Sequence, residues 1–465
     1  GRDGSWFDKI MFETPSAQSA QSAQSAQSAQ SVQSHDRHER RDLAADPPVS
    51  FSLQWHLPVG CDWSGFFVEG LGFGVGLARA VGEDAFALSV GACSEEMLAQ
   101  LTEAEQRLVS RRAPLDAMAH EYHAVVLHKR PGRDFVLPPY RRRARRGAAD
   151  LVIGRMMTES AKLPLRESRQ AEQVDEVWVP TEWHRGVFQH AGVDPVKIRV
   201  MPEPVDTVFF DPKKAHANSL ANTNTAAAAA LEPASGDVIT RFVSVFKWEH
   251  RKGWDVLLDA FWTAFDRDDP VELHMRTYKP SWEPGTKNID TIIEQHARAF
   301  LKRQVSEHDN TSRRVLPIVR WERKDLSRKE LRAFYHAASA FVLPTRGEGW
   351  CLPAVEAMSM ALPVIVTNFS GPSAYLSTSH AYPVGVAAAL NRDGTAEPLV
   401  ADVIAALRQV AARPKDASMV GRRARQWVQA HLDTDVVARR VKKSIILSLQ
   451  KQARDGTVRA EAIEL

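Results

Sequence analysis

Short apolar runs alternate with longer amphipathic stretches from about residue 50 onward. The first set is VSFSLQW, AFALSV, YHAVVLH, DLVIG, DEVWVP and KIRVM, between residues 49 and 201. A second set starts after residue 238 with RFVSVF, VELHM, RVLPIV, SAFVLP and PVIVT. Strands that alternate with helices are typical of βαβ units and a parallel sheet. The pattern therefore predicts two doubly wound α/β domains.

The stretch from residue 417 to residue 450 has a helical period instead. Its apolar side chains fall on two stripes, Trp427, Val428 and Leu432 on the first and Val436, Val437, Val441 and Ile445 on the second. No strand follows it, so we expect these residues to pack across the domain boundary and return to the first domain.

Two segments lack any apolar period. Ser16–Ser31 repeats Ser-Ala-Gln, which buries too little apolar surface to offset the entropy of ordering. Asn218–Asp237 is polar and Ala-rich and indicates a linker. The expected divisions are a disordered tail (1–46), a first Rossmann-like domain (47–210), a linker (211–237), a second Rossmann-like domain (238–432) and a crossover helix with its tail (433–465).

Composition narrows the function classes. The chain has 465 residues, enough for two full cores, and its 60 basic and 57 acidic residues nearly balance. That balance does not suggest a nucleic-acid or membrane-surface protein. The basic run Tyr140–Gly147 is a solvated face or a site for an acidic partner. No apolar stretch reaches the roughly 20 residues of a membrane span, so we expect a soluble, cytoplasmic protein.

Cys61, Cys93 and Cys351 are an odd number of cysteines without metal-like spacing. This argues against a disulfide framework and favours a reducing compartment. We expect three small buried side chains. The chain begins at Gly1, which leaves room for a further N-terminal extension.

Charged residues follow the strands of the second set, at the edge where open parallel sheets bind ligands. RFVSVF is followed by Lys247 and Lys252, and SAFVLP by the loop 346–349 and then Glu356. Lysines and helix N-termini supply the positive charge and N–H groups that a diphosphate needs. Carboxylates such as Glu348 and Glu356 can accept hydrogen bonds from the vicinal hydroxyls of two sugar rings. A nucleotide-sugar has both parts.

The segments FKWEHRKGWDVLLDAF and RGEGWCLPAVEAMSMALPVIVTNFSGPSAYL resemble the donor domain of retaining GT-B glycosyltransferases of the glycosyltransferase-4 type, the glycosyl transferases group 1. The resemblance continues upstream through VIGRMMTES, VDEVWVPTEWHRGVF and KIRVMPEPVDTVFFDP, so it covers roughly residues 120 to 450. It implies a GT-B architecture, with two doubly wound Rossmann-like domains facing a cleft and a C-terminal helix that crosses back to the first domain.

The resemblance also implies roles for single residues. The E-x7-E pair of the family matches Glu348, which would contact the transferred sugar, and Glu356, which would contact the ribose. Lys252 and Lys247, the latter in place of a commoner Arg, would hold the diphosphate. Further expected donor-side residues are Arg346, Gly347, Gly349, Trp350, Cys351 and Leu352, and expected acceptor-side residues are His128 and Gly65.

Three positions depart from the family pattern. Cys351 and Ala361 stand where glycine is usual, and PEPVD (Pro202–Asp206) replaces PNGVD. A side chain at position 351 could narrow the sugar pocket or mark lost activity.

Several of these residues also have structural explanations. An acid such as Glu356 is favoured in the first turn of a helix, and Arg346 is as well suited to a structural salt bridge as to a phosphate. His128 can equally be a satisfied buried histidine. A glycosidase would also use two carboxylates, although a shared loop and helix after one strand fits that class less well.

Two further motifs favour structural roles. The glycines between Gly70 and Gly82 do not follow G-x-G-x-x-G and predict close helix packing. Asp266–Asp269 has the Asp-x-Asp spacing of metal-dependent GT-A transferases, but it precedes a strand, at the opposite edge of the sheet, and predicts a polar turn.

The predicted function is therefore a retaining hexosyltransferase of carbohydrate biosynthesis that needs no metal ion and no cofactor. Its donor would be a UDP- or GDP-linked sugar, and its acceptor a glycan, a lipid-linked or a small-molecule hydroxyl. We expect no nucleic-acid partner. The alternative is a non-catalytic nucleotide- or sugar-binding or scaffold protein on the same fold.

Overall fold

The computed structural model describes residues 51–57, 61, 64–111, 122–128, 149–214, 239–280, 283, 285, 288–307, 315–322 and 326–455. The predicted tail (1–46), the basic run (140–147) and the segment 218–237 lie outside these residues. The described residues belong to one compact unit, Phe51–Val458.

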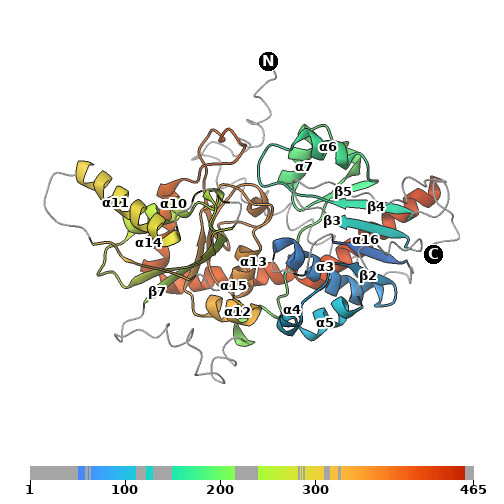
Figure 1. The fold of residues 1–465 in the computed structure, drawn as a ribbon, viewed down its shortest axis with the longest axis horizontal. Coiled ribbons are helices and arrows are strands. Elements are labelled where there is room, and N and C mark those ends of the chain that lie inside the picture. The colour runs from blue at the N-terminus through green and yellow to red at the C-terminus, as the bar shows by residue number, and fades with distance from the viewer. Residues whose placement is uncertain are drawn as a thin grey trace, which may run out of the picture. The chain divides into compact units, whose positions relative to one another are not determined.

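The first sheet has six parallel strands in the order β2-β1-β3-β4-β5-β6 (Figure 1). The strands are β1 (Leu53–His56), β2 (Phe86–Ser89), β3 (Ala124–His128), β4 (Leu151–Arg155), β5 (Glu176–Val179) and β6 (Ile198–Val200). The helices are α3 (Gly65–Val81), α4 (Glu95–Gln100), α5 (Glu103–Ser110), α6 (Leu165–Ala171) and α7 (Glu182–His190), followed by the 3-10 turn η2 (Pro195–Lys197). Each of the six apolar runs contains one strand, because a parallel sheet covered on both faces needs nearly continuous apolar strands.

The second sheet also has six parallel strands, in the order β12-β11-β10-β7-β8-β9. The strands are β7 (Thr240–Lys247), β8 (Val271–Tyr278), β9 (Ile318–Glu322), β10 (Ala340–Leu343), β11 (Val364–Thr367) and β12 (Tyr382–Val384). The helices are α10 (Trp254–Ala264), α11 (Ile289–Glu307), α12 (Arg328–His336), α13 (Leu352–Ser359) and α14 (Val400–Ala412), with 3-10 turns η3 (His250–Lys252) and η4 (Gly371–Ala374). The sequence pattern did not predict β12, a three-residue edge strand with Pro383 at its centre.

Apolar side chains between the strands and the covering helices form the core of each half. In the first half, Val125 and Val177 of the sheet belong to one cluster with Phe188 of α7. In the second half, Phe242 of β7 packs near Phe261 of α10, with ring centroids 6.2 Å apart. No helix among the described residues is both long and apolar enough to cross a membrane.

Two C-terminal helices, α15 (Pro414–His431) and α16 (Thr434–Arg454), connect the halves (Figure 1). α15 packs on the second half, where a Cβ at Gly421 would lie 2.1 Å from the Ala361 carbonyl oxygen. α16 packs on α3, where a Cβ at Gly76 would lie 2.7 Å from the Thr434 carbonyl oxygen. The predicted return of the last helix to the first half is confirmed, as is the close helix packing predicted from the glycines of α3.

Cys61 and Cys93 form a disulfide. The expectation of unpaired cysteines is therefore wrong for this pair, and the inference of a reducing compartment loses its support. β1 and β2 are neighbouring parallel strands with His56 opposite Ser89, so the loops after them begin at the same edge. This proximity brings together two cysteines that lie 32 residues apart in the chain. Cys351 is free and buried.

Candidate functional site

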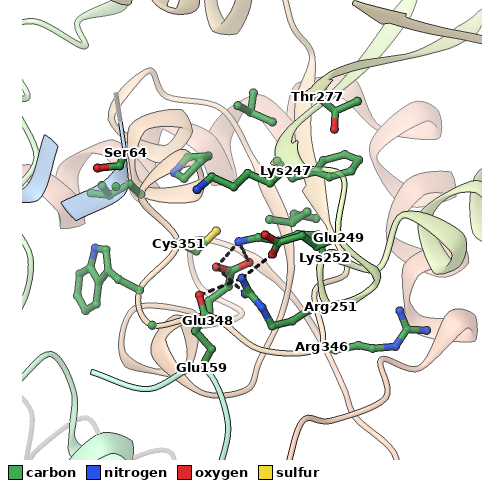
Figure 2. Close-up of a pocket in the computed structure, with 18 of the residues that line it drawn as sticks. Ser64, Glu159, Lys247, Glu249, Arg251, Lys252, Thr277, Arg346, Glu348 and Cys351 are labelled. Atoms are coloured by element: carbon green, nitrogen blue, oxygen red, sulfur yellow. Dashed lines mark hydrogen bonds and ion pairs between the residues drawn. The ribbon is translucent and has the colours of Figure 1, made fainter. Parts of the chain in front are cut away.

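A cavity of about 1640 Å³ lies beyond the carboxyl ends of strands from both sheets (Figure 2). Ser64 follows β1, Met157 follows β4, and Lys247 is the last residue of β7. Ten of the residues expected from the sequence line the cavity: Gly65, Lys247, Lys252, Arg346, Glu348, Gly349, Trp350, Cys351, Leu352 and Glu356. Gly347 and His128 are not among the lining residues.

The loop after β7 approaches the loop after β10 because η3 ends at Gly253. Gly253 has a φ of +68°, and a Cβ there would lie 1.9 Å from the Pro344 carbonyl oxygen. Only glycine permits this approach. The Arg346 N–H then donates to the Arg251 carbonyl at 2.7 Å, which sets Lys252 beside Glu348.

Glu348 is the centre of a buried ion cluster (Figure 2). Lys252 Nζ lies 2.7 Å from both carboxylate oxygens, and Arg251 Nη1 lies 3.5 Å from Oε2. The Thr345 hydroxyl donates to Oε1 at 3.0 Å. Burial alone would raise the pKa of Glu348, but Lys252 and Arg251 outweigh burial and lower it. The cluster therefore presents an ionised carboxylate and two cations to a ligand.

Glu356 has a different environment, although it lies only one helix turn into α13. It is buried, and the Tyr335 hydroxyl of α12 donates to its Oε2 at 3.0 Å. Burial raises its pKa to about 7, because the Tyr335 hydrogen bond and the more distant Arg328 offset burial only in part. The two carboxyls of the E-x7-E motif therefore differ in charge near neutral pH.

Arg346 is held by structural partners. Asp255 accepts from Nη1 and Nη2 at 2.8 Å each, and Glu397 accepts from Nε at 2.8 Å and from Nη2 at 2.7 Å. The His250 carbonyl accepts the remaining Nη1 hydrogen bond at 2.8 Å. Figure 2 shows Arg346 pointing away from Glu348. These contacts favour the structural salt bridge over a phosphate contact, since all five guanidinium donors already have acceptors.

The turn before α13 has the backbone that glycine would give it. Cys351 has a φ of +78° and Ala361, at the other end of α13, a φ of +60°. Both positions where the family usually has glycine therefore adopt the left-handed conformation. The Tyr375 hydroxyl donates to the Trp350 carbonyl at 2.8 Å and fixes the turn. Burial raises the pKa of the Cys351 thiol, so it is neutral.

The same loop touches the first half of the molecule. A Cβ at Gly347 would lie 2.1 Å from the Glu159 carbonyl oxygen, and one at Gly349 would lie 2.5 Å from Met157 Sδ. Arg251 Nη2 is 2.9 Å from Glu159 Oε1. The segment after β4 therefore borders the loop that carries Glu348.

His128 lies behind the cavity wall rather than on it. Its Nε2 is 3.0 Å from Glu69 Oε2, and the Trp55 indole N–H donates to its Nδ1 at 3.3 Å. Because Trp55 can only donate, Nδ1 is the acceptor and the ring proton is on Nε2. These contacts favour the structural explanation of His128.

The predicted polar turn at Asp266–Asp269 is confirmed. The Asp266 N–H donates to Asp269 Oδ2 at 2.7 Å just before β8, away from the cavity lining. Within the described ranges, no three His, Cys, Asp or Glu side chains are grouped so that they could hold a metal ion.

The sequence does not predict the buried charge cluster on the first-half side, which is formed by Glu69 of α3, Arg155 at the end of β4 and Glu203 after β6. Arg155 Nε donates to Glu69 Oε1 at 2.9 Å. Burial would raise the pKa of Glu69, but His128 and Arg155 lower it. These residues share no motif spacing, since Glu69 and Arg155 lie 86 positions apart. Their one sequence signal is that Arg155 and Glu203 stand at strand ends.

One family model matches part of the chain. Residues 238–409 match the family model described as Glycosyl transferases group 1. This range includes Lys247, Lys252, Glu348 and Glu356. No curated protein sequence matches the chain.

Solved structures with the same arrangement of sheets identify the fold. HepE from Anabaena, in complex with UDP and glucose, is 10% identical, with a TM-score of 0.55 over 85% of this chain and 100% of that one. A glycosyltransferase from Rickettsia africae is 12% identical, with a TM-score of 0.57 over 86% and 99%. Sucrose-phosphate synthase from Thermosynechococcus elongatus is 14% identical, with a TM-score of 0.53 over 86% and 100%.

The fold is GT-B. Its two six-stranded parallel sheets, with α16 returning to α3, have the architecture that the resemblance implied. Together with the group 1 domain over residues 238–409, this fold supports a GT-B glycosyltransferase.

Proposed function

We propose that this protein transfers a hexose from a UDP- or GDP-linked sugar to an acceptor hydroxyl, with retention of the anomeric configuration and without a metal ion. The main observation in support is the Glu348–Lys252 ion pair, which lies in the part of the chain that matches the group 1 family model. Both residues line one cavity together with Lys247 and Glu356. A nucleotide-sugar donor is further supported by HepE, whose solved complexes contain UDP and UDP-glucose.

Each part of such a donor has a complementary group in the cavity. Lys247 and Lys252 supply positive charge for the diphosphate, next to the turn at Cys351 that begins α13. Glu356 would accept hydrogen bonds from the ribose hydroxyls. Glu348 would accept hydrogen bonds from the transferred hexose. The acceptor would enter beside Ser64 and Gly65 of the first half.

Transfer would break the bond between the anomeric carbon and the diphosphate oxygen, which leaves with the bonding electrons. The acceptor oxygen would bond to the same face of that carbon, and its proton would pass to the departing phosphate. The protein's contribution is to orient the two substrates and to stabilise the developing negative charge with Lys252 and Lys247.

Incubation with a panel of UDP- and GDP-linked hexoses, with and without EDTA, tests this proposal through the release of free nucleotide. We expect at least one donor to be cleaved at a rate that EDTA does not change, and NMR of the transfer product to show the donor's anomeric configuration. Glu348→Gln is the matched control for contaminating activity. An inverted product, or activity only with added Mn²⁺, would contradict the corresponding part of the proposal.

A non-catalytic nucleotide- or sugar-binding protein is the second candidate. It is favoured by Cys351, whose side chain occupies a turn that lines the cavity and has the backbone conformation of a glycine. This candidate predicts that UDP or GDP binds, while no donor in the panel is cleaved faster by the wild-type protein than by Glu348→Gln.

A further inference from the structure

Glu203 is a buried carboxyl on the cavity wall whose Oε1 lacks a hydrogen bond among the described residues. It lines the cavity and is only 2% exposed. No described donor forms a hydrogen bond with its Oε1, and Arg155 Nη2 lies 3.9 Å away. An unsatisfied carboxyl in such a position costs stability and calls for an explanation.

Arg155 does not satisfy Glu203 with a hydrogen bond, because Nη2 is 3.9 Å from Glu203 Oε1, and Nη2 itself has no hydrogen-bond partner among the described residues. Its Nε donates to Glu69 Oε1 at 2.9 Å, and its Nη2 lies 2.8 Å from the same oxygen. Its Nη1 donates to the Met201 carbonyl at 2.5 Å. The cluster thus has two carboxyls for one guanidinium, and Glu203 is the one without a close partner.

The backbone holds Glu203 rigidly at this place. It lies between Pro202 and Pro204. Each proline ring fixes its own φ angle, and Pro204 also restricts the backbone of Glu203 before it. Pro204 packs against α3 so closely that a Cβ at Gly72 would lie 3.0 Å from its Cγ. A rigid frame around an unsatisfied polar group is typical of a preorganised binding site.

The charges around Glu203 favour its neutral form. Burial raises its pKa well above the usual value, and the carboxylates of Glu69 and Glu348 raise it further, whereas Arg155 only partly opposes them. Glu203 and Glu348 line the same cavity. A neutral carboxyl has one donor and further acceptor capacity, as a sugar hydroxyl has.

We propose that Glu203 binds a hydroxyl group of the transferred hexose, donating one hydrogen bond to it or accepting one from it, and so helps to determine which sugar the site accepts. This inference rests on the proposed function. It adds a contact from the first half of the molecule to the donor-side residues 247–356, and it gives the departure PEPVD a chemical role.

The test compares Glu203→Gln, which keeps a neutral donor and acceptor, with Glu203→Met, which keeps only the volume. Calorimetric titrations use UDP and UDP-glucose, and GDP and GDP-mannose, with each protein. We expect Glu203→Met to bind the free nucleotide as the wild type does but the nucleotide-sugar about tenfold more weakly or worse. Glu203→Gln should bind both ligands within about threefold of the wild type.

Three results would overturn the proposal. In the first, Glu203→Met binds nucleotide and nucleotide-sugar with wild-type affinities. In the second, Glu203→Gln loses as much sugar affinity as Glu203→Met, which would mean that the carboxyl acts as an anion. In the third, Glu203→Met lowers the melting temperature by several degrees and weakens both ligands equally, which would make Glu203 a structural partner of Arg155. Failure of the proposed function itself is seen separately, as wild-type protein that binds none of the four ligands.

Discussion

At the scale of single residues, the site is governed by how burial and neighbouring charge set the ionisation of each carboxyl. Glu348 keeps its charge because Lys252 and Arg251 contact it, whereas Glu356 has only a neutral hydroxyl and a distant arginine. This difference is consistent with the separate roles proposed for two residues that share one loop and helix, and it leads to distinct expectations for their variants.

Nucleotide affinity should depend on pH through Glu356. Its pKa is raised to about 7, and the ionised form is the better acceptor for two ribose hydroxyls. Affinity should therefore be highest above pH 7 and fall by up to about tenfold per pH unit as the pH drops below 7. Calorimetry between about pH 5.5 and 8.5 measures this. Glu356→Gln is the matched control, because the phosphates of the nucleotide titrate identically with the wild type and with the variant. The variant should lack the part of the pH dependence of affinity that comes from Glu356. Parallel profiles for the two proteins would contradict the ribose contact.

Glu348→Gln should affect the chemical step more than binding. The variant loses the carboxylate that we propose to contact the transferred sugar, and it releases Lys252 from its ion pair with Glu348, so that Lys252 can still pair with the proposed diphosphate. We expect single-turnover transfer to slow by roughly 100-fold or more, while free nucleotide binds nearly as well as to the wild type. Equal loss of nucleotide binding in Glu348→Gln and Glu356→Gln would show that Glu348 only anchors its loop.

Ala361 should be a site where glycine stabilises the protein. Its φ of +60° costs an alanine about 1 kcal/mol or more, and this strain exceeds the entropy that glycine adds to the unfolded chain. Ala361→Gly should therefore raise the free energy of unfolding by about 0.5–1 kcal/mol, measured by denaturant titration. The control is Ala405→Gly, at an exposed position of α14. This substitution should lower the free energy of unfolding by about 1 kcal/mol. Similar losses in both variants would refute the strain at Ala361.

Some single residues of the site can be predicted from the sequence, and others cannot. The family pattern identified positions 351 and 361, and both carry the left-handed backbone that explains the usual glycine. It gave no hint of the cluster around Arg155, because the three side chains meet only once β4, β6 and α3 are assembled. Residues that are brought together only by the fold show no recognisable motif spacing in the sequence.

At the scale of helices and strands, the apolar runs predict β1 to β8, β10 and β11, because strands covered on both faces are largely apolar. Two edge strands are exceptions. The run RVLPIV overlaps β9 only at Ile318 and Val319, since this partly exposed strand continues to Glu322, and β12 is too short for any period and contains a proline. The disulfide was missed for a related reason. The number of cysteines says little about their pairing. The order of strands in the sheet decides it, because Cys61 and Cys93 follow adjacent parallel strands.

The contact between α3 and α16 should tolerate no side chain at Gly76. A Cβ there would meet the Thr434 carbonyl oxygen at 2.7 Å and the Ala438 Cβ at 2.9 Å, neither of which can move independently of α16. Gly76→Ala should lower the free energy of unfolding by about 1–3 kcal/mol. Gly72→Ala is the matched control on the same helix, since it meets only Pro204 at 3.0 Å and gains the same helix propensity. Equal stability of the two variants would contradict the predicted packing.

At the scale of the whole molecule, one cavity collects the strand ends of both sheets. Contacts such as the buried Arg328–Glu105 pair and the hydrogen bond from Thr207 to Asp433 link segments far apart in the chain. The first half contributes Ser64, Gly65 and Glu203 to the cavity, and the second half contributes Lys247, Lys252, Glu348 and Glu356. This division fits the proposed function, in which the donor lies against the second half and the acceptor enters beside the first.

Calorimetric titration of the full chain with UDP, GDP and ADP tests the central claim most directly, because it needs neither the sugar nor the acceptor. The account predicts that at least one nucleotide binds and that Lys252→Met weakens it by about tenfold or more, as loss of a charge-assisted contact should. If none of the three binds to the wild-type protein at millimolar concentration, or if Lys252→Met binds as tightly as the wild type, the cavity is not a nucleotide-sugar site.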